Sequence, residues 1–251
     1  MRATSVAGGG DVVIGGGGVA GLVCALELAR RPVTLITAAA LDDVATTAAA
    51  RDGIAAAEFA GDTAEQYVMD TIAAGEGIAD ERIVRLVTRD GPGRIGELRG
   101  YGASRNGGRE DPAGGNIMAD LAGAVRATPS IRVIEHYSVE DLVKEGSRVA
   151  GLLAIAEGIG GGPAEIRLSA RAVVLATGGI GALYSTTNNS NQARRQGVAI
   201  AARAGALIAH AEFVQFVSSG PGPPAAPFPL GGLPPPPHSR RRRTPTRDLC
   251  A

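Results

Sequence analysis

The sequence predicts an α/β fold in which a parallel sheet is interrupted by an inserted antiparallel β meander. An apolar run at residues 11–14 is followed without a gap by glycines and an apolar helix, and another apolar run occupies residues 33–36. Three short β-like runs then lie between residues 138 and 169, before a further apolar run that begins after Arg171. A helix between two apolar runs is typical of a parallel βαβ unit, whereas short runs joined by tight turns indicate antiparallel strands.

The glycines of the first turn have the spacing G-x-G-x-x-G when Gly16, Gly18 and Gly21 are taken as the fixed positions. In such a fingerprint the first glycine allows a sharp turn, the second lets a pyrophosphate approach the backbone, and the third lets the helix pack on the strand. The free N–H groups of the helix would bind the pyrophosphate. These features predict a Rossmann-like dinucleotide-binding unit. Gly15 stands where the strand should still be apolar, which predicts a loop one residue longer than ideal.

The context of the glycines supports this interpretation. Residues 19–30 have helical spacing, Pro32 stops the helix, and the whole unit has about the ~30 residues expected of a βαβ motif. The alternative is a glycine-rich turn in an ordinary α/β protein, because the chain contains 37 glycines in 251 residues.

Further elements follow from periodicity and turn signals. Helices are expected at residues 62–79, from the N-cap Asp80 to about residue 89, and at residues 92–99, 118–127 and 192–206, with a loop at 101–116. Strands are expected at residues 131–134, 138–144, 148–156 and 164–169, and a buried strand starting at Arg171 ends in a glycine turn at Gly179.

Composition excludes several classes of protein. Hydrophobic residues make up 45% of the chain, and Lys+Arg and Asp+Glu both number 25, so nothing overall suggests a nucleic-acid or anionic-membrane partner. Cys24 and Cys250 have neither metal-type spacing nor a disulfide framework, which favours a reducing cytoplasm. We expect no metal site, no transmembrane helix and no signal peptide.

The composition changes near Val217. Prolines are frequent from there on, and an arginine run occupies residues 240–243. Such a segment cannot bury a core, so we expect a folded domain over residues 1–217 and a disordered, solvated tail over residues 218–251. A basic tail that binds nucleic acid or an anionic surface is the alternative.

Four segments in a fixed order carry a resemblance to a known family. They are the first glycine turn, residues 46–57, residues 172–181 with their Ala-Thr-Gly-Gly-Ile-Gly ending, and the Glu-Phe-Val-Gln-Phe segment at residues 212–216. Together they resemble the L-aspartate oxidases, within the succinate dehydrogenase/fumarate reductase flavoprotein family. The resemblance covers about residues 11–216 and implies that FAD is the cofactor.

The resemblance also assigns positions to the cofactor. Residues at the first turn would cradle the pyrophosphate: Gly16, Gly18, Val19, Ala20 and Gly21. A second group would pass along the flavin: Thr46, Thr47, Gly53, Ile54 and Ala55. A third group would lie against the adenosine side: Ala176, Thr177 and Gly178.

Thr37 completes the predicted set of cofactor-binding residues. NAD-binding Rossmann units usually carry an acid about 20 residues beyond the first glycines, where it binds ribose hydroxyls. The strand here ends in Thr37 without a carboxylate. Aspartate oxidases likewise tend to lack this acid, so its absence supports the resemblance and argues against the remaining alternative, an NAD-linked Rossmann protein.

The resemblance implies a reaction as well. Hydride passes from the α-carbon of L-aspartate to flavin N5, giving iminoaspartate, and oxygen or fumarate reoxidises the flavin. The implied partners are L-aspartate or a related dicarboxylate and, because the product feeds quinolinate and NAD synthesis, quinolinate synthase. An amino-diacid substrate needs paired cations, usually arginine, with help from histidine.

The chain departs from the family pattern where that pattern contacts substrate and flavin. Arg51 and Asp52 replace the usual Gln-Gly, and Gln196 stands at an aspartate position. Phe216 is followed by Val217 and two serines rather than by His-Pro-Thr. The loop before residue 118 is shortened, and the chain has roughly half the family's length, so we expect an incomplete FAD-binding domain with low or no activity.

No catalytic residue is assigned from the sequence. His210 is expected to be an ordinary, partly buried histidine, and Cys24 a small buried thiol beside the pyrophosphate. A nucleotide-binding remnant without enzymatic activity is therefore the main alternative to a flavoenzyme. The abrupt change at Val217 also suggests translation in a shifted frame.

Overall fold

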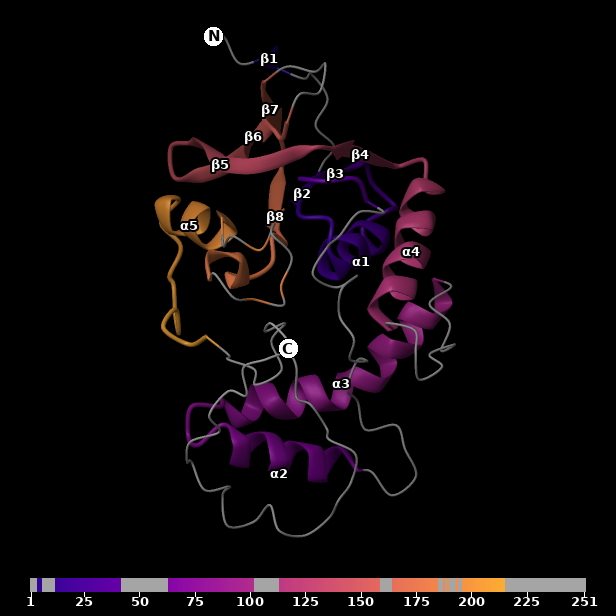
Figure 1. The fold of residues 1–251 in the computed structure, drawn as a ribbon, viewed down its shortest axis with the longest axis vertical. Helices are drawn as coiled ribbons and strands as arrows, with labels where there is room; N and C mark the ends of the chain where they lie inside the picture. The colour runs from indigo at the N-terminus through magenta and orange to yellow at the C-terminus, as the bar shows by residue number, and fades with distance from the viewer. Residues whose placement is uncertain are drawn as a thin grey trace, which may run out of the picture.

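The computed structural model describes residues 4–5, 12–41, 63–101, 113–158, 164–184, 187, 189, 193 and 196–214, and all structural statements concern these residues. Their strands form two four-stranded sheets, with helices on both sides of the strands and a helical pair extending away from them (Figure 1). The predicted tail at residues 218–251 lies outside the described residues.

The parallel sheet has the strand order β4-β3-β2-β8. Its members are β2 (Val12–Gly15), β3 (Val33–Thr37), β4 (Ile131–Glu135) and β8 (Ala172–Leu175). Every neighbouring pair runs parallel, so the carboxyl ends of all four strands meet at one edge of the sheet. The chain moves from β2 to β3 on one side and later returns to β8 on the other, which makes the end of β2 a topological switch point of the kind where ligands bind.

Helix α1 (Val19–Glu27) connects β2 to β3, as predicted, but it ends three residues earlier than residue 30. The prediction about Gly15 was wrong: this residue is the last of β2 and pairs with both Ile36 and Leu175. A Cβ on Gly15 would lie 2.6 Å from Val139 Cγ2 of the second sheet. Gly15 is therefore a strand residue whose missing side chain lets the two sheets pack closely.

Two apolar layers flank the parallel sheet. On one face, α1 and α4 (Ala113–Arg126) pack against side chains such as Ile14 and Leu35, which are fully buried. On the other face, Val13 and Ile36 meet the second sheet. Alternation of side chains along β2 and β3 explains why both strands are buried throughout, since each face of the sheet has its own cover.

The second sheet has the order β1-β7-β6-β5. Its strands are β1 (Thr4–Ser5), β5 (Tyr137–Glu145), β6 (Arg148–Ala156) and β7 (Glu165–Ser169). The antiparallel pairs β5–β6 and β6–β7 confirm the predicted meander, which is inserted between β4 and β8. The short β1, which the sequence did not predict, adds a parallel pair at the edge of the meander.

A pair of helices, α2 (Ala64–Ala74) and α3 (Glu81–Gly100), extends away from the sheets (Figure 1). Asp80 caps α3 as predicted, its carboxylate accepting the N–H groups of Arg82 and Ile83. The predicted break between residues 89 and 92 was wrong, because α3 continues through Pro92. Proline removes one backbone hydrogen bond and crowds the preceding turn, but it does not prevent the residues on either side from remaining helical.

Three other helix bounds differ from the predictions. Helix α2 ends at Ala74 rather than at residue 79. Helix α4 begins at Ala113 rather than near residue 118, and α5 (Gln196–Arg203) is shorter than residues 192–206. Strand β8 was predicted to be buried, but it is the edge strand of the parallel sheet within the described residues and is only half-buried. Hydrophobic sequence alone does not reveal which strand of a sheet lies at the edge.

Candidate functional site

The turn after β2 leaves no room for side chains. Gly16 has a φ of +122°, a conformation that residues with a Cβ rarely adopt, and its N–H donates to the carbonyl oxygen of Ile36 at 2.8 Å. A Cβ on Gly16 would lie 2.1 Å from the carbonyl oxygen of Ala176. Only glycine can therefore occupy position 16 in this turn.

Gly21 brings the start of α1 against this turn. A Cβ on Gly21 would lie 1.9 Å from the carbonyl oxygen of Gly16, so a larger residue would push the helix away from the strand. The geometry agrees with the role expected of the third glycine in the fingerprint.

The N-terminus of α1 opens at the same place. Gly18 is the N-cap residue, with extended backbone and no side-chain capping hydrogen bond, and the N–H of Leu22 bonds to its carbonyl oxygen at 3.0 Å. The N–H groups of Val19, Ala20 and Gly21 precede that first helical bond and therefore belong to the free end of the helix. A free helix N-terminus is suited to an anion such as a pyrophosphate.

Gly17 and Thr37 form one wall of the turn. Thr37 is the last residue of β3 and is buried, and its Oγ1 lies 2.7 Å from the position of a Cβ on Gly17. Thr37, one of the predicted cofactor-binding residues, thus lies beside the glycines, whereas Gly17 had no predicted role. The signal was present, since Gly17 is one of four consecutive glycines at residues 15–18.

Ala176, Thr177 and Gly178 form the opposite wall. The N–H of Ala176 donates to the carbonyl oxygen of Gly15 at 2.8 Å, and Gly178 has a φ of +76°. Because β8 and β3 lie on opposite sides of β2, these residues and Thr37 flank the glycine turn from opposite sides. A cofactor whose adenosine lies near Thr37 would thus contact Ala176 through a part other than the adenosine.

Nine of the fourteen predicted cofactor-binding residues lie together around this turn. The other five, Thr46, Thr47, Gly53, Ile54 and Ala55, lie outside the described residues. Glycines keep the floor of this turn free of side chains at a free helix N-terminus, an arrangement that fits the pyrophosphate of a dinucleotide.

His210 and Cys24 are the acid–base and thiol groups considered from the sequence. His210 is exposed rather than partly buried, with a φ of 55°, and its ring stacks on Phe213 with 5.5 Å between centroids. Cys24 is partly buried in α1, and burial raises the pKa of its thiol, which disfavours the reactive thiolate.

The described part of the Glu-Phe-Val-Gln-Phe segment forms no strand. Phe213 follows a turn, is 52% exposed and belongs to no strand. Gln215 and Phe216 lie outside the described residues.

Two further expectations concern metals and membranes. Within the described residues, no group of three or more His, Cys, Asp or Glu side chains has the arrangement of a metal site. No helix of the described part of the chain has both the length and the apolar character needed to cross a membrane.

Comparison with known proteins shows which family the chain resembles. The FAD-binding domain family matches residues 11–114 and 107–222. An L-aspartate oxidase of Agrobacterium fabrum is 38% identical over 239 residues, covering 87% of this chain and 45% of that protein. An L-aspartate oxidase of Streptomyces coelicolor is 39% identical, covering 82% of this chain and 39% of that protein. The chain thus spans less than half the length of these curated relatives.

Solved structures show the same fold. The Sdh1 complex of Mycobacterium smegmatis contains a chain with a TM-score of 0.69 and 27% identity, covering 82% of this chain and 39% of that one. The quinol fumarate reductase chain FrdA of E. coli has a TM-score of 0.70 at 24% identity, covering 80% of this chain and 37% of that one. The predicted resemblance to flavoproteins of this group is confirmed.

Proposed function

The chain belongs to the FAD-binding domain family, and on that premise we propose that it binds FAD at the β2–α1 turn as part of an L-aspartate oxidase. One observation carries the proposal. At the switch point of the parallel sheet, Gly16 and Gly21 leave no room for a Cβ, and the N-terminus of α1 is free of a side-chain cap. That combination suits a pyrophosphate.

The proposed contacts follow from the two walls of the turn. The N–H groups of residues 19–21 hold the pyrophosphate, and Thr37 lies on the adenosine side. Ala176, Thr177 and Gly178 were predicted for the adenosine side as well. Their place across β2 from Thr37 favours contact with the pyrophosphate or the riboflavin half instead. Residues 46–55 are proposed to pass along the flavin.

The proposed reaction is oxidation of L-aspartate to iminoaspartate. When bound, FAD supplies the redox chemistry by accepting hydride from the substrate α-carbon, with oxygen or fumarate as the final acceptor. The chain's own residues orient the cofactor and keep its pyrophosphate on the helix N-terminus. Catalytic residues stay unassigned. A cytoplasmic location, and quinolinate synthase as the consumer of the product, belong to the same proposal.

Gly18→Val is the direct test of the binding site. Gly18 has a φ of −77°, which valine also adopts, so the fold should survive while the branched side chain blocks the pyrophosphate. We expect the FAD content of the purified protein, measured by absorbance after cofactor loading, to fall to near zero with an unchanged circular dichroism spectrum.

Gly123→Val is the matched control. Gly123 lies on the exposed side of α4, and a Cβ there meets nothing within 4 Å. The control should keep the FAD content of the parent. If Gly18→Val also kept it, the site would lie elsewhere.

The activity of the 251-residue chain is tested separately. The residues after Phe216 depart from the family motif, so we propose that this chain, loaded with FAD, oxidises L-aspartate far more slowly than a full-length relative. An assay for hydrogen peroxide or iminoaspartate measures the rate of this chain against that of the full-length relative. FAD binding without turnover would support the alternative of a nucleotide-binding protein that is not an enzyme, whereas turnover at the relative's rate would exclude it.

A further inference from the structure

A carboxylate lies beside the position where the β3 strand lacks one. Nucleotide-binding strands equivalent to β3 usually end in an acid that binds ribose hydroxyls, but β3 ends in Thr37. Thr37 pairs in register with Glu135, the last residue of the neighbouring strand β4. The two residues therefore stand side by side at the ligand-binding edge of the sheet.

The Glu135 side chain bonds across the turn that follows β3. Its Oε1 accepts the N–H of Leu41 at 2.8 Å and a hydrogen bond from Arg126 Nη2 at 3.0 Å. Arg126 is the last residue of α4, where the helix dipole favours a cation. One carboxylate thus joins β4, α4 and the segment after β3.

Leu41 links this bond to the glycine turn. Its side chain is 4% exposed, and its Cδ2 lies 3.5 Å from the position of a Cβ on Gly17. Thr37 Oγ1 lies 2.7 Å from the same position. The wall beside the glycines therefore has two contact points, and the hydrogen bond to Glu135 fixes the backbone of one of them.

We propose that Glu135 is a positioning residue for the adenine dinucleotide. By holding the N–H of Leu41 it fixes residues 38–41 against Gly17, so that the turn receiving the pyrophosphate and the adenosine half is already formed before binding. The acid absent from β3 is replaced in this role by one from the adjacent strand, which acts through the backbone of Leu41. The inference rests on the proposed binding of FAD at this turn.

Arg126 gives the carboxylate a partner without adding charge to the site. An unpaired carboxylate at this edge would repel the pyrophosphate, whereas the ion pair is formally neutral. Glu135 then acts through the geometry of its hydrogen bonds rather than through its charge. An ordinary surface ion pair, by contrast, contributes little to stability.

Three variants test the proposal. Glu135→Ala removes the acceptor, and we expect the dissociation constants of FAD and of ADP to rise together by about tenfold, as for loss of a hydrogen bond to a charged group. Glu135→Gln keeps a side-chain oxygen that can accept the Leu41 N–H, and it should retain most of the affinity. Glu145→Ala is the control, because it breaks an exposed Arg148–Glu145 ion pair in the β5–β6 turn and should change neither constant.

Hydrogen exchange of the ligand-free protein provides the second measurement. Peptides covering residues 38–41 should exchange faster in Glu135→Ala than in the parent and the control. The exchange comparison needs no ligand, and an unchanged exchange rate overturns the proposal. An affinity of Glu135→Ala for FAD within about twofold of the parent also overturns it. If Glu135→Gln is as weak as Glu135→Ala, charge pairing explains the effect and positioning through Leu41 is wrong. If the parent binds neither FAD nor ADP, the proposed function itself falls.

Discussion

The βαβ unit and the α2–α3 helical pair are stabilised by different kinds of interaction. Every residue of β2 and β3 is buried, and their side chains are covered on both faces of the sheet. In α3, by contrast, Thr88 is the one buried residue, although the helix has 20 residues, while Ile83, Leu86 and Val87 are exposed. Apolar burial stabilises the first region, whereas local polar contacts and the packing at its ends stabilise the second.

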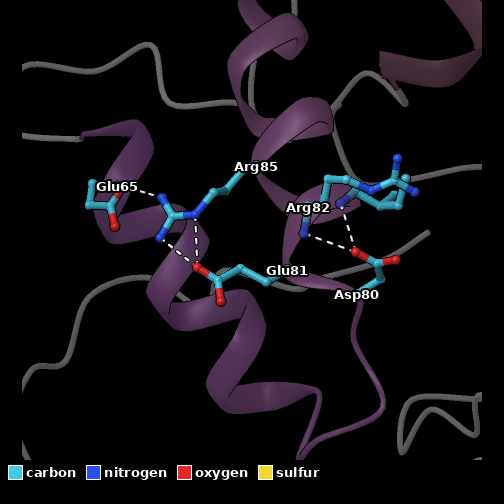
Figure 2. A network of polar contacts seen from close by, with 6 residues as sticks. Glu65, Asp80, Glu81, Arg82 and Arg85 are labelled. Atoms are coloured by element: carbon cyan, nitrogen blue, oxygen red, sulfur yellow. Dashed lines mark hydrogen bonds and ion pairs between the residues drawn. The ribbon is translucent and has the colours of Figure 1, made fainter.

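The ends of α3 show what takes the place of burial. At its start, Asp80 caps the helix, and Arg85 bridges Glu81 of the same helix and Glu65 of α2 (Figure 2). At its finish, the Tyr101 hydroxyl donates to Glu27 Oε1 at 2.8 Å, and the ring packs on the core. The Glu27 carboxylate raises the pKa of Tyr101, because the hydrogen bond favours the protonated phenol. The comparison teaches that the proposed nucleotide site lies on the region whose strands are fully buried, whereas the helical pair has few buried residues.

The largest expected difference comes from truncating one apolar residue in each region. Leu35 is fully buried in β3, and Leu35→Ala should lower the free energy of unfolding by about 2–5 kcal/mol through lost transfer energy and a cavity. Val87 is 62% exposed, and Val87→Ala should change it by no more than about 0.5 kcal/mol. Urea unfolding of both variants measures this. Equal effects would mean that apolar burial stabilises the helical pair as much as it stabilises the sheet.

Adding a methyl group at a glycine should act in opposite directions in the two regions. Gly21→Ala places a Cβ 1.9 Å from the Gly16 carbonyl oxygen, and it should destabilise the fold by about 1–3 kcal/mol and weaken FAD binding. Thermal unfolding and FAD titration of the same preparation check both effects. A variant with the stability and FAD affinity of the parent would show that the turn can shift to accommodate a Cβ at position 21.

Gly96→Ala is the counterpart in α3. Gly96 is exposed in the helix, and a Cβ there meets nothing within 4 Å. Alanine should raise the free energy of unfolding by about 0.5–1 kcal/mol, because it reduces the freedom of the unfolded chain. The melting temperature should rise slightly with FAD affinity unchanged. A fall in stability would indicate that the glycines of α3 are required for packing.

The smallest effect concerns the exposed Arg85 bridge. The hydrogen bond from Arg85 lowers the pKa of Glu65 below its ordinary value. A depressed folded-state pKa gives stability that is present above the ordinary value of about 4.3 and is lost as the pH falls through the folded-state value. Glu65→Gln should therefore lower the melting temperature slightly at about pH 7, and this difference should shrink as the pH falls below the ordinary value, with both proteins measured at each pH. A difference that persists in acid would show that the ion pair is not its cause.

Several features of this protein followed from the sequence alone. The βαβ unit, the meander and the Asp80 cap depend on residues close together in the chain, whose spacing and hydrogen-bonding capacity predict the local structure. The positions of Gly16, Gly18 and Gly21 also predicted the candidate site, since the fingerprint is contained in one turn. The resemblance to FAD-binding flavoproteins rested on the same local segments and is confirmed by the family match.

Tertiary structure decided the features that depend on partners distant in the chain. Gly15 is a strand residue because it pairs with Ile36 and Leu175, and His210 is exposed because no described element covers it. Glu135 lies 98 positions after Thr37 in the sequence, yet the two pair in register because β3 and β4 are neighbours in the parallel sheet. Periodicity and composition describe which face of an element is apolar, but strand order determines which residues of different elements meet.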